Sequence, residues 1–211
     1  MRKPGLQLGI AVFVIAAIVA GAFVYLRQNK GASVAGQASA AQFYGAAFDP
    51  VVAAPEITLT THKGEPFSLT AQKGKVVVLF FGYTSCPDVC PTTLAHFRHV
   101  KQRLGEAAEN VRFVMVTVDP ERDDQQRMRQ YVEAFDPDFI GLTGTPAELQ
   151  TAWDAYYVQP QKIESANSAL GYSVTHPASS YVVDRQGNLR LLHFYGMPAD
   201  EVAEDLKKLL A

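Results

Sequence analysis

The pattern of hydrophobic and polar positions divides the chain into one long apolar run near the N-terminus and a series of shorter periodic segments after it. Residues 8–26 are uncharged and nearly all apolar. A helix of this length reaches about 28 Å, enough to cross a hydrocarbon core of about 30 Å. We therefore expect a single N-terminal transmembrane helix, with a membrane anchor at residues 1–30 and a flexible tether at residues 31–48.

A cleavable signal peptide is the alternative for the same run. Its apolar core would be shorter, about 7–15 residues, and would end close to a small-residue cleavage site. The site at residues 38–40 lies far beyond the end of the run, which favours an uncleaved anchor. Basic residues flank both ends of the run, and the slight excess on the N-terminal side predicts that the domain lies outside. No Arg/Ser-rich transit peptide is present, so we expect a bacterial inner-membrane protein with a periplasmic domain.

Residues 49–211 carry the pattern of one α/β domain. Two apolar, β-branched runs, 76–81 and 111–118, have the composition of strands buried on both faces. A segment of helical period follows each run; the first comes after Pro91, and Asp123 and Asp124 open the second. These are two β-α units.

The remaining segments complete the domain with hairpins and a terminal helix. They are a hairpin at 57–60 and 67–69, a short strand at 139–142, a capped helix start at 145–148, a loop or hairpin insertion at 159–171, a hairpin at 180–183 and 189–194, and a helix at 201–210. This order predicts a thioredoxin-like α/β fold, with a mixed sheet and helices on both faces.

Charge argues against one class of partner. Without the four basic residues that flank the apolar run, the chain has a net charge of −6 and no block of Lys and Arg. Nucleic-acid binding therefore has no electrostatic support.

The chain has only two cysteines, Cys86 and Cys90. As a disulfide they would close almost no loop and add little stability, so a chemical purpose is favoured. They follow a buried strand and precede a helix, whose N-terminus stabilises a thiolate. At this spacing a helical turn would let them form a disulfide or chelate one soft ion. A pair of buried core thiols is the alternative, and the flanking prolines and Asp88 argue against it.

Among five histidines, His176 is the candidate for a third ligand. It precedes a predicted strand, and the proline after it favours extended backbone. The residues alone leave open whether it binds a metal or is a hydrogen-bonded loop histidine. His96 and His99 are expected to be solvated or to cap the helix, and His62 and His193 to be structural.

Two thiolates and one imidazole would suit Cu(I), which accepts three ligands. Zinc also takes two Cys and one His, with water as the fourth ligand, and spacing alone does not separate the two metals. In either case affinity would fall as pH drops, because the ligands must lose protons.

In the order and spacing of its motifs, the sequence resembles the Sco/SenC family over roughly residues 50–208. The matching stretches are FFGYTSCPDVCP at 80–91, VTVDPERD at 116–123, and YSVTH at 172–176 with Tyr181 and Asp184 after it. The resemblance implies a thioredoxin-like fold and copper, as Cu(I) or Cu(II), bound by Cys86, Cys90 and His176. It also implies a role in building the dinuclear copper centre of cytochrome c oxidase. One departure is Thr175, where an acidic residue is expected.

Several functions are compatible with these features. The favoured one is a metallochaperone, rather than an enzyme, that delivers copper to the copper-bearing subunit of cytochrome c oxidase; another periplasmic copper chaperone or a thiol reductant would be a further partner. The alternative is a thiol–disulfide oxidoreductase that uses Cys86 and Cys90 to reduce the oxidase's copper-ligating cysteines. A membrane-tethered copper or redox sensor is a third class. A peroxiredoxin is less favoured, because no Arg and Thr support the cysteine motif. His176 discriminates among them, since a reductase gains nothing from a third soft ligand.

Overall fold

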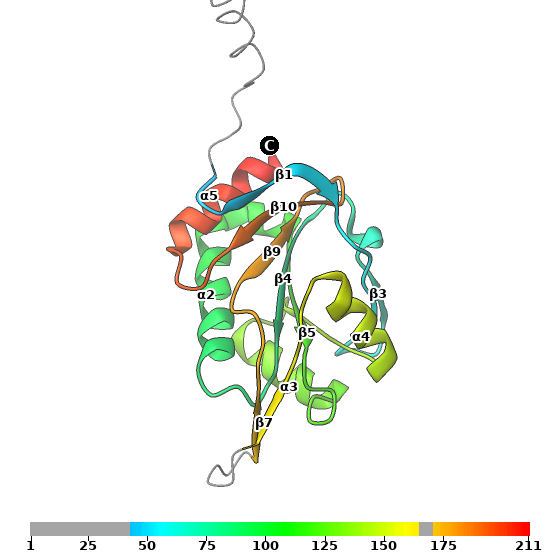
Figure 1. The fold of residues 1–211 in the computed structure, drawn as a ribbon. Helices are drawn as coiled ribbons and strands as arrows, with labels where there is room; N and C mark the ends of the chain where they lie inside the picture. Colours follow the sequence, from blue (N-terminus) through cyan, green and yellow to red (C-terminus); the bar gives the residue numbers. More distant parts are fainter. Residues whose placement is uncertain (1–42, 165–170) are drawn as a thin grey trace, which may run out of the picture. The chain divides into compact units, whose positions relative to one another are not determined.

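The computed structural model describes residues 43–164 and 171–211 (Figure 1). The apolar run at 8–26 and residues 31–42 of the expected tether lie outside these residues. Within the two described ranges, no helix is long and apolar enough to span a bilayer.

The described elements are ten strands, four α-helices and two short 3₁₀-helices. The strands are β1 (Ala46–Ala53), β2 (Thr58–Thr61), β3 (Pro66–Ser68), β4 (Val76–Gly82), β5 (Val111–Thr117), β6 (Ile140–Thr143), β7 (Lys162–Glu164), β8 (Tyr172–Val174), β9 (Ser180–Val183) and β10 (Asn188–His193). The helices are α2 (Val89–Leu104), α3 (Gln125–Phe135), α4 (Pro146–Ala155) and α5 (Ala199–Leu210), with η1 (Thr70–Gln72) and η2 (Gly105–Asn110).

Eight of these strands form one mixed sheet, in the order β1-β10-β9-β4-β5-β6-β2-β3. β4, β5 and β6 are parallel to one another, and every other pair of neighbours in this sheet is antiparallel. β7 and β8 form a separate antiparallel hairpin. The predicted mixed sheet is therefore confirmed. The segment expected to be a loop or hairpin insertion contains β7, which pairs with β8.

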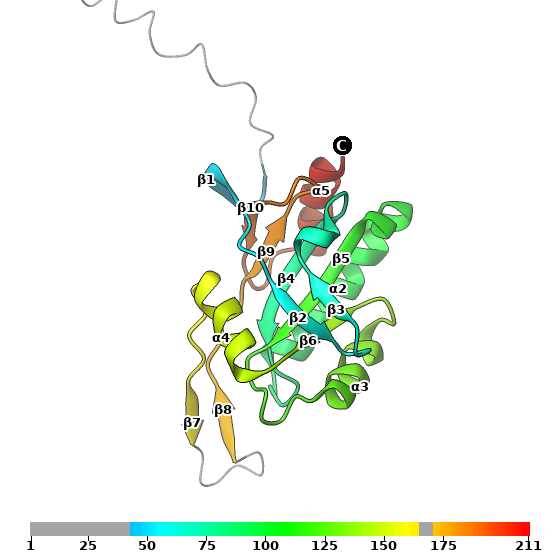
Figure 2. The same ribbon diagram turned by 90° about the vertical axis from the view of Figure 1, so that its right-hand side faces the viewer.

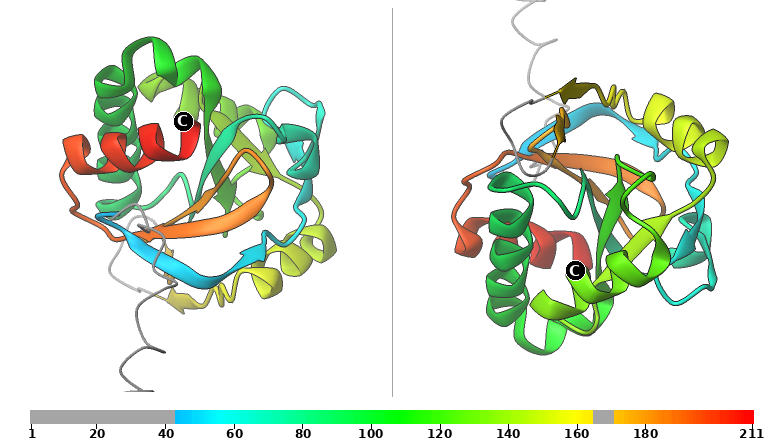
Figure 3. Two further views of the ribbon diagram at one scale, coloured as in Figure 1. Left: turned by 90° about the horizontal axis from the view of Figure 1, so that it is seen from above. Right: turned by 90° about the horizontal axis from the view of Figure 1, so that it is seen from below.

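Helices cover both faces of the sheet, as predicted. α2, α3 and α5 lie on one face and α4 lies on the other (Figures 2 and 3). The β4–α2–β5 and β5–α3–β6 connections both join parallel neighbours, and right-handed crossovers in the same direction place both helices on one face. α4 begins with the predicted capping box, in which the Thr145 hydroxyl accepts from the Glu148 amide and the Glu148 carboxylate accepts from the Thr145 amide.

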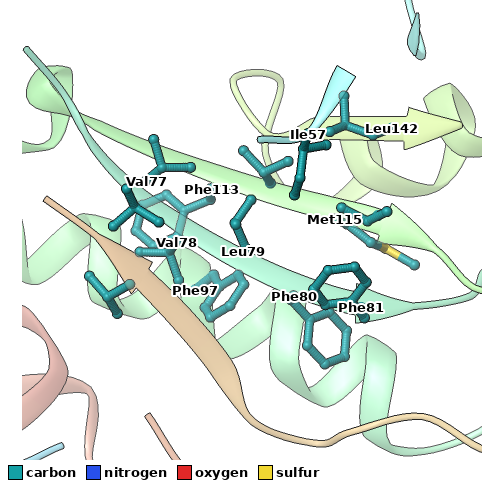
Figure 4. Packing of buried hydrophobic residues seen from close by; sticks show 14 of the residues in the cluster. Ile57, Val77, Val78, Leu79, Phe80, Phe81, Phe97, Phe113, Met115 and Leu142 are labelled. Atoms are coloured by element: carbon teal, nitrogen blue, oxygen red, sulfur yellow. The ribbon is translucent and has the colours of Figure 1, made fainter. Parts of the chain in front are cut away.

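β4 is the centre of the core and is buried along its whole length (Figure 4). Phe80 meets Phe97 of α2 edge-on, with ring centroids 6.3 Å apart. On the opposite face Phe81 packs against Tyr156 and Tyr181, with centroids 5.5 and 6.0 Å away. Burial of each such side chain is worth about 1.5–3 kcal/mol. The end of β4 is therefore a firmly held position from which a site can be built.

β1 is an element that the sequence pattern does not predict. It begins at Ala46, inside the segment expected to be a tether, so ordered structure starts before residue 49. It is an edge strand paired with β10, it is exposed at nearly every position, and its pairing shifts register between Ala47 and Val52. An exposed, irregular edge strand that contains Pro50 lacks the alternation by which strands are recognised.

Candidate metal centre

Both cysteines lie where β4 leads into α2. Cys86 lies in the connecting turn and Cys90 lies in the first turn of the helix, which begins before Pro91 and not after it as predicted. The side chain of Asp88, just before the helix, caps no amide; instead the Cys90 N–H donates to the Cys86 sulfur at 3.5 Å. Cys86 thus occupies the role of a capping acceptor, where the partial positive charge of the helix end favours a thiolate.

Cys90 packs directly against the end of β4. A Cβ on Gly82 would lie 2.8 Å from the Cys90 sulfur and 2.6 Å from the Phe80 ring, so only glycine permits this approach. The Tyr83 N–H donates to the same sulfur at 3.4 Å. Cys90 is fully buried, whereas Cys86 is half-buried. The backbone of the strand therefore positions one sulfur, and the other lies nearer to solvent.

The two thiols differ in their electrostatics. The hydrogen bond from Cys90 holds the pKa of Cys86 well below the usual range of a thiol. The same pairing with Cys86, together with burial, raises the pKa of Cys90. The metal-free pair therefore holds one proton, and Cys86 is the thiolate.

His176 reaches the two sulfurs from the loop between β8 and β9. Its Nε2 lies 3.8 Å from the Cys86 sulfur and 3.5 Å from the Cys90 sulfur. Its Nδ1 lies 3.0 Å from the Pro177 carbonyl oxygen, and this contact assigns the N–H of a neutral ring to Nδ1. The lone pair on Nε2 is then directed at the sulfurs, as a metal ligand requires.

Backbone contacts tie the His176 loop to its surroundings. The Thr175 N–H donates to the Gln161 carbonyl at 2.9 Å, and the Gln161 N–H donates to the Thr175 hydroxyl at 3.0 Å. One residue earlier, the Val174 N–H donates to the Tyr83 hydroxyl at 3.3 Å. Thr175, the departure from the expected acidic residue, thus anchors the loop to Gln161 by hydrogen bonds.

Arg122 supports the same loop from the segment after β5. Its guanidinium carbon lies 3.7 Å from the centroid of the Tyr172 ring and 5.6 Å from that of Tyr83. Arg122 also donates to the Tyr172 carbonyl at 3.1 Å and pairs with Asp119, which accepts from the Tyr172 hydroxyl at 2.8 Å. The motif at 116–123 therefore holds the β7–β8 hairpin, and the loop with His176 follows directly after this hairpin.

Asp123 serves the cysteine turn and does not open a helix. Asp124 caps α3, accepting from the Arg127 N–H at 2.8 Å. Asp123 is buried and accepts from the Thr84 N–H at 3.0 Å, the Thr84 hydroxyl at 2.6 Å and the Thr117 hydroxyl at 2.7 Å. It therefore fastens the turn to β5. Two adjacent aspartates look alike in sequence, so only the tertiary contacts separate their roles.

The other histidines lie away from the sulfurs. His62 is buried and accepts from the Gly141 N–H at 3.0 Å, and the Nε2 of buried His193 lies 3.2 Å from Asp205, so both are structural as predicted. His99 is exposed, also as predicted. His96 differs from the prediction, because its Nε2 is shielded from solvent.

Cys86, Cys90 and His176 are the predicted ligands that the structure brings together. Their three donor atoms all lie within 4.8 Å of one another. Across residues 43–164 and 171–211 this is the one group of three or more Cys, His or acidic side chains placed to hold a metal ion. Two sulfurs and one imidazole nitrogen form a soft donor set, and this set fits a copper ion.

Comparison with known proteins gives a consistent result. The SCO1/SenC family model matches residues 49–211. An SCO2-like protein of Rickettsia prowazekii is 32% identical over 150 residues, which cover 71% of this chain and 73% of that protein.

Solved structures give the same answer. The copper-bound ScoI of Bradyrhizobium japonicum is 35% identical, with a TM-score of 0.69 and coverage of 75% of this chain and 99% of the other. Apo Sco1 from Thermus thermophilus is 37% identical, with a TM-score of 0.71 and coverage of 80% and 98%. These matches confirm the resemblance and the thioredoxin-like fold. The chain belongs to the SCO1/SenC family.

Proposed function

We propose that the chain binds one copper ion through Cys86, Cys90 and His176, and delivers it to the copper-bearing subunit of a cytochrome c oxidase during assembly. The observation that carries the proposal is the approach of His176 Nε2 to within 3.8 Å of both sulfurs, although 86 residues separate it from Cys90. The copper-bound relative from B. japonicum, at 35% identity, supports the choice of metal.

The unequal burial of the ligands supports delivery by ligand exchange. Cys90 is enclosed, whereas Cys86 and His176 are half-buried. A thiolate of the recipient can therefore approach the copper from the side of Cys86 and His176, and the buried Cys90 leaves last. The recipient's ligands replace those of the chain one at a time, so the ion is never released to solvent.

The second candidate function is reduction of the recipient's cysteines. The lowered pKa of Cys86 favours this reductase function, because a thiolate at a helix N-terminus is a nucleophile. Cys86 would attack the recipient's disulfide, and Cys90 would resolve the mixed disulfide. The chain's two thiols would become a disulfide while the recipient gains two thiols. His176 has no part in these steps.

A pair of transfer experiments separates the two functions. The copper-loaded chain is mixed anaerobically with the reduced, copper-free domain of the oxidase subunit, and the reduced metal-free chain with the same domain in its oxidised form. We expect His176→Ala to lose copper transfer and to keep disulfide reduction, and exposed His99→Ala to change neither. Copper transfer by His176→Ala at the wild-type rate would contradict the delivery function.

We also propose that residues 1–30 anchor the chain in a bacterial inner membrane, with residues 49–211 in the periplasm. The uncharged run at 8–26 and its flanking basic residues support this. In cells, the chain should stay with membranes after alkaline carbonate extraction, and protease added to spheroplasts should digest the domain. Recovery in the soluble fraction would contradict the anchor.

A further inference from the structure

A pocket beside the N-terminal half of α2 is separate from the three proposed ligands. Its volume is about 210 Å³. α2, the segment at 178–180, the loop between β10 and α5, and α5 itself contribute to its walls. Figures 1 and 3 show that loop running beside α2. Residues that matter for its chemistry are His96, Phe97, His193, Phe194, Met197 and Val202.

Two imidazole nitrogens of this pocket are buried and make no hydrogen bond of good geometry, namely His96 Nε2 and His193 Nδ1. The His96 ring also interacts with the Met197 backbone, whereas His193 Nδ1 is unpaired. His193 is only 4% exposed, and its other nitrogen is already engaged by Asp205. Burial lowers the pKa of His96, so its ring is neutral at neutral pH and one of its nitrogens is an acceptor. A buried polar atom left unpaired costs about 1–3 kcal/mol. A ligand that supplies a hydrogen bond would recover this cost.

The rest of the lining is suited to an apolar group. Phe97 and Val202 are buried side chains that supply apolar surface, and the sulfur of Met197 is polarisable and adapts to ring edges. A cavity of about 150 Å³ is large enough to hold benzene, so a single aromatic ring fits this volume. An aromatic ring that carries a polar group matches both the apolar wall and the buried nitrogens.

The pocket adjoins the metal centre through shared elements. Phe97 contacts Phe80 at a centroid distance of 6.3 Å, and Phe80 contacts the His176 ring at 5.8 Å. Thr93, which also lines the pocket, lies one helical turn after Cys90, and Ala178 lies two residues after His176. A group in the pocket therefore rests on the same helix turn and the same loop that carry the ligands.

Aromatic side chains at the pocket are also unusually exposed. Phe194 and Tyr195, both lining residues, are 54% and 47% exposed. Large apolar side chains gathered beside a cavity mark a surface that contacts another protein. This exposure argues for a polypeptide partner, because a small ligand held inside the pocket would leave both rings uncovered.

We infer that the pocket receives one tryptophan or tyrosine side chain of the protein that exchanges copper with this chain, with its N–H or O–H bonded to His96 or His193. This docking places the partner beside the loop of His176 and the first turn of α2. The identity of the partner rests on the proposed function, whereas the chemistry of the pocket's ligand does not.

The chemistry is tested on the full chain with small probes: 3-methylindole and p-cresol as the side chains of tryptophan and tyrosine, and toluene as the matched ring without a donor. Binding is followed by NMR of the histidine ring nitrogens. We expect 3-methylindole or p-cresol to bind about tenfold more tightly than toluene, in line with one hydrogen bond to a buried acceptor. His96→Phe should abolish this preference, and Val202→Phe, which fills the pocket from α5, should abolish binding.

The docking role is tested by the rate of copper transfer to the oxidase domain. His96→Phe should slow transfer about tenfold while copper affinity stays within about twofold of wild type, because no ligand is changed. His99→Phe, on the exposed side of the same helix, is the matched control and should transfer at the wild-type rate. Val202→Phe should repeat the result of His96→Phe if the latter folds poorly.

Three outcomes would overturn the inference. Absence of probe binding, or equal binding of toluene and 3-methylindole, would show a pocket that holds water or any apolar group. A second copper ion that binds wild type and not His96→Phe would show a metal site instead. Normal transfer by both pocket variants would remove the docking role. If wild type neither binds nor transfers copper, the proposed function fails, and the probe titration still decides the chemistry of the pocket.

Discussion

The cysteine turn and the His176 loop contribute to one site but are held in different ways. The turn follows a strand that is buried along its whole length, and Cys90 is fixed by the Tyr83 amide and by the missing side chain of Gly82. The loop follows a short hairpin outside the main sheet (Figure 1). Its contacts come from side chains distant in sequence, such as Arg122 on Tyr172.

This difference predicts that the site has two unequal halves. The cysteine turn, with Cys86 and Cys90, is the preformed half, and the loop of His176 is the dependent half. Disturbing the hairpin should weaken copper binding only through His176, and should leave the cysteines as a two-ligand site. Disturbing the end of β4 should affect the fold and copper binding together, because the core and the ligand share the same backbone.

Cys90→Ser should have the largest effect on copper binding. The buried sulfur is the proposed ligand that the strand holds most firmly, and a hydroxyl is a poor ligand for a soft ion. We expect Cu(I) affinity to fall by more than about 100-fold, beyond the usual effect of changes outside the ligand set. Competition with a chelator measures it, with His99→Ala as the control. A loss of less than tenfold would show that Cys90 is not a ligand.

Copper affinity should rise with pH at the slope of a single proton. The hydrogen bond with Cys86, together with burial, raises the pKa of Cys90, so at neutral pH Cys90 is protonated and Cys86 is not. Binding must then release about one proton, and affinity should rise about tenfold per pH unit between about pH 7 and 9. Titration calorimetry in buffers of different ionisation enthalpy counts the protons. Release of two protons per copper would contradict the claim that only one of the two cysteines is protonated in the metal-free chain.

Gly82→Ala should damage the preformed half. The new Cβ would meet the Cys90 sulfur and the Phe80 ring, and such overpacking costs about 1–3 kcal/mol. We expect a loss of this size in the free energy of unfolding, measured with denaturant, and weaker copper binding. Gly105→Ala is the control without overpacking, because a Cβ at this position meets open space. Any loss of stability in this variant comes from strain at its positive φ and not from packing. Wild-type copper binding by Gly82→Ala would contradict the claim that the core and Cys90 depend on the same stretch of backbone.

Tyr172→Leu should damage only the dependent half. It removes the ring under Arg122 and the hydroxyl bonded to Asp119. We expect copper affinity to fall about tenfold, as for other residues that orient a ligand. In a His176→Ala background the same substitution should have no effect on copper affinity. Tyr157→Leu, at a residue 91% exposed, is the matched control. Additive losses would show that Tyr172 acts independently of His176.

Thr175→Ala should have the smallest effect. It removes the hydroxyl that accepts from the Gln161 amide, a contact worth about 0.5–1.5 kcal/mol. We expect copper affinity to fall about threefold, and Thr175→Ser to restore it. Equal affinities for all three proteins, measured by chelator competition, would show that this anchor does not position His176.

The cysteine half of the site was predictable because its signals are local. An apolar run, a turn with prolines and a helical period place Cys86 and Cys90 at the end of a strand without knowledge of any other segment. The helix start was misplaced by a few residues, since the acceptor before α2 is a sulfur and not the usual oxygen.

The histidine half was less predictable because its contacts are tertiary. From the residues alone His176 was as compatible with a loop histidine as with a ligand, and the resemblance to a family decided between them. The sequence neither distinguishes the role of Asp123 from that of Asp124 nor indicates the support from Arg122, because both act across the fold. β1 was missed because an exposed edge strand carries no hydrophobic alternation.

The most direct test of the central claim is an anaerobic Cu(I) titration of the reduced full chain against a competing chelator, with His176→Ala measured in parallel. A three-ligand site predicts one tightly bound copper per chain, and an affinity about tenfold or more weaker in His176→Ala. Equal affinity in the two proteins would contradict a three-ligand site, and would leave the cysteine pair as a redox couple.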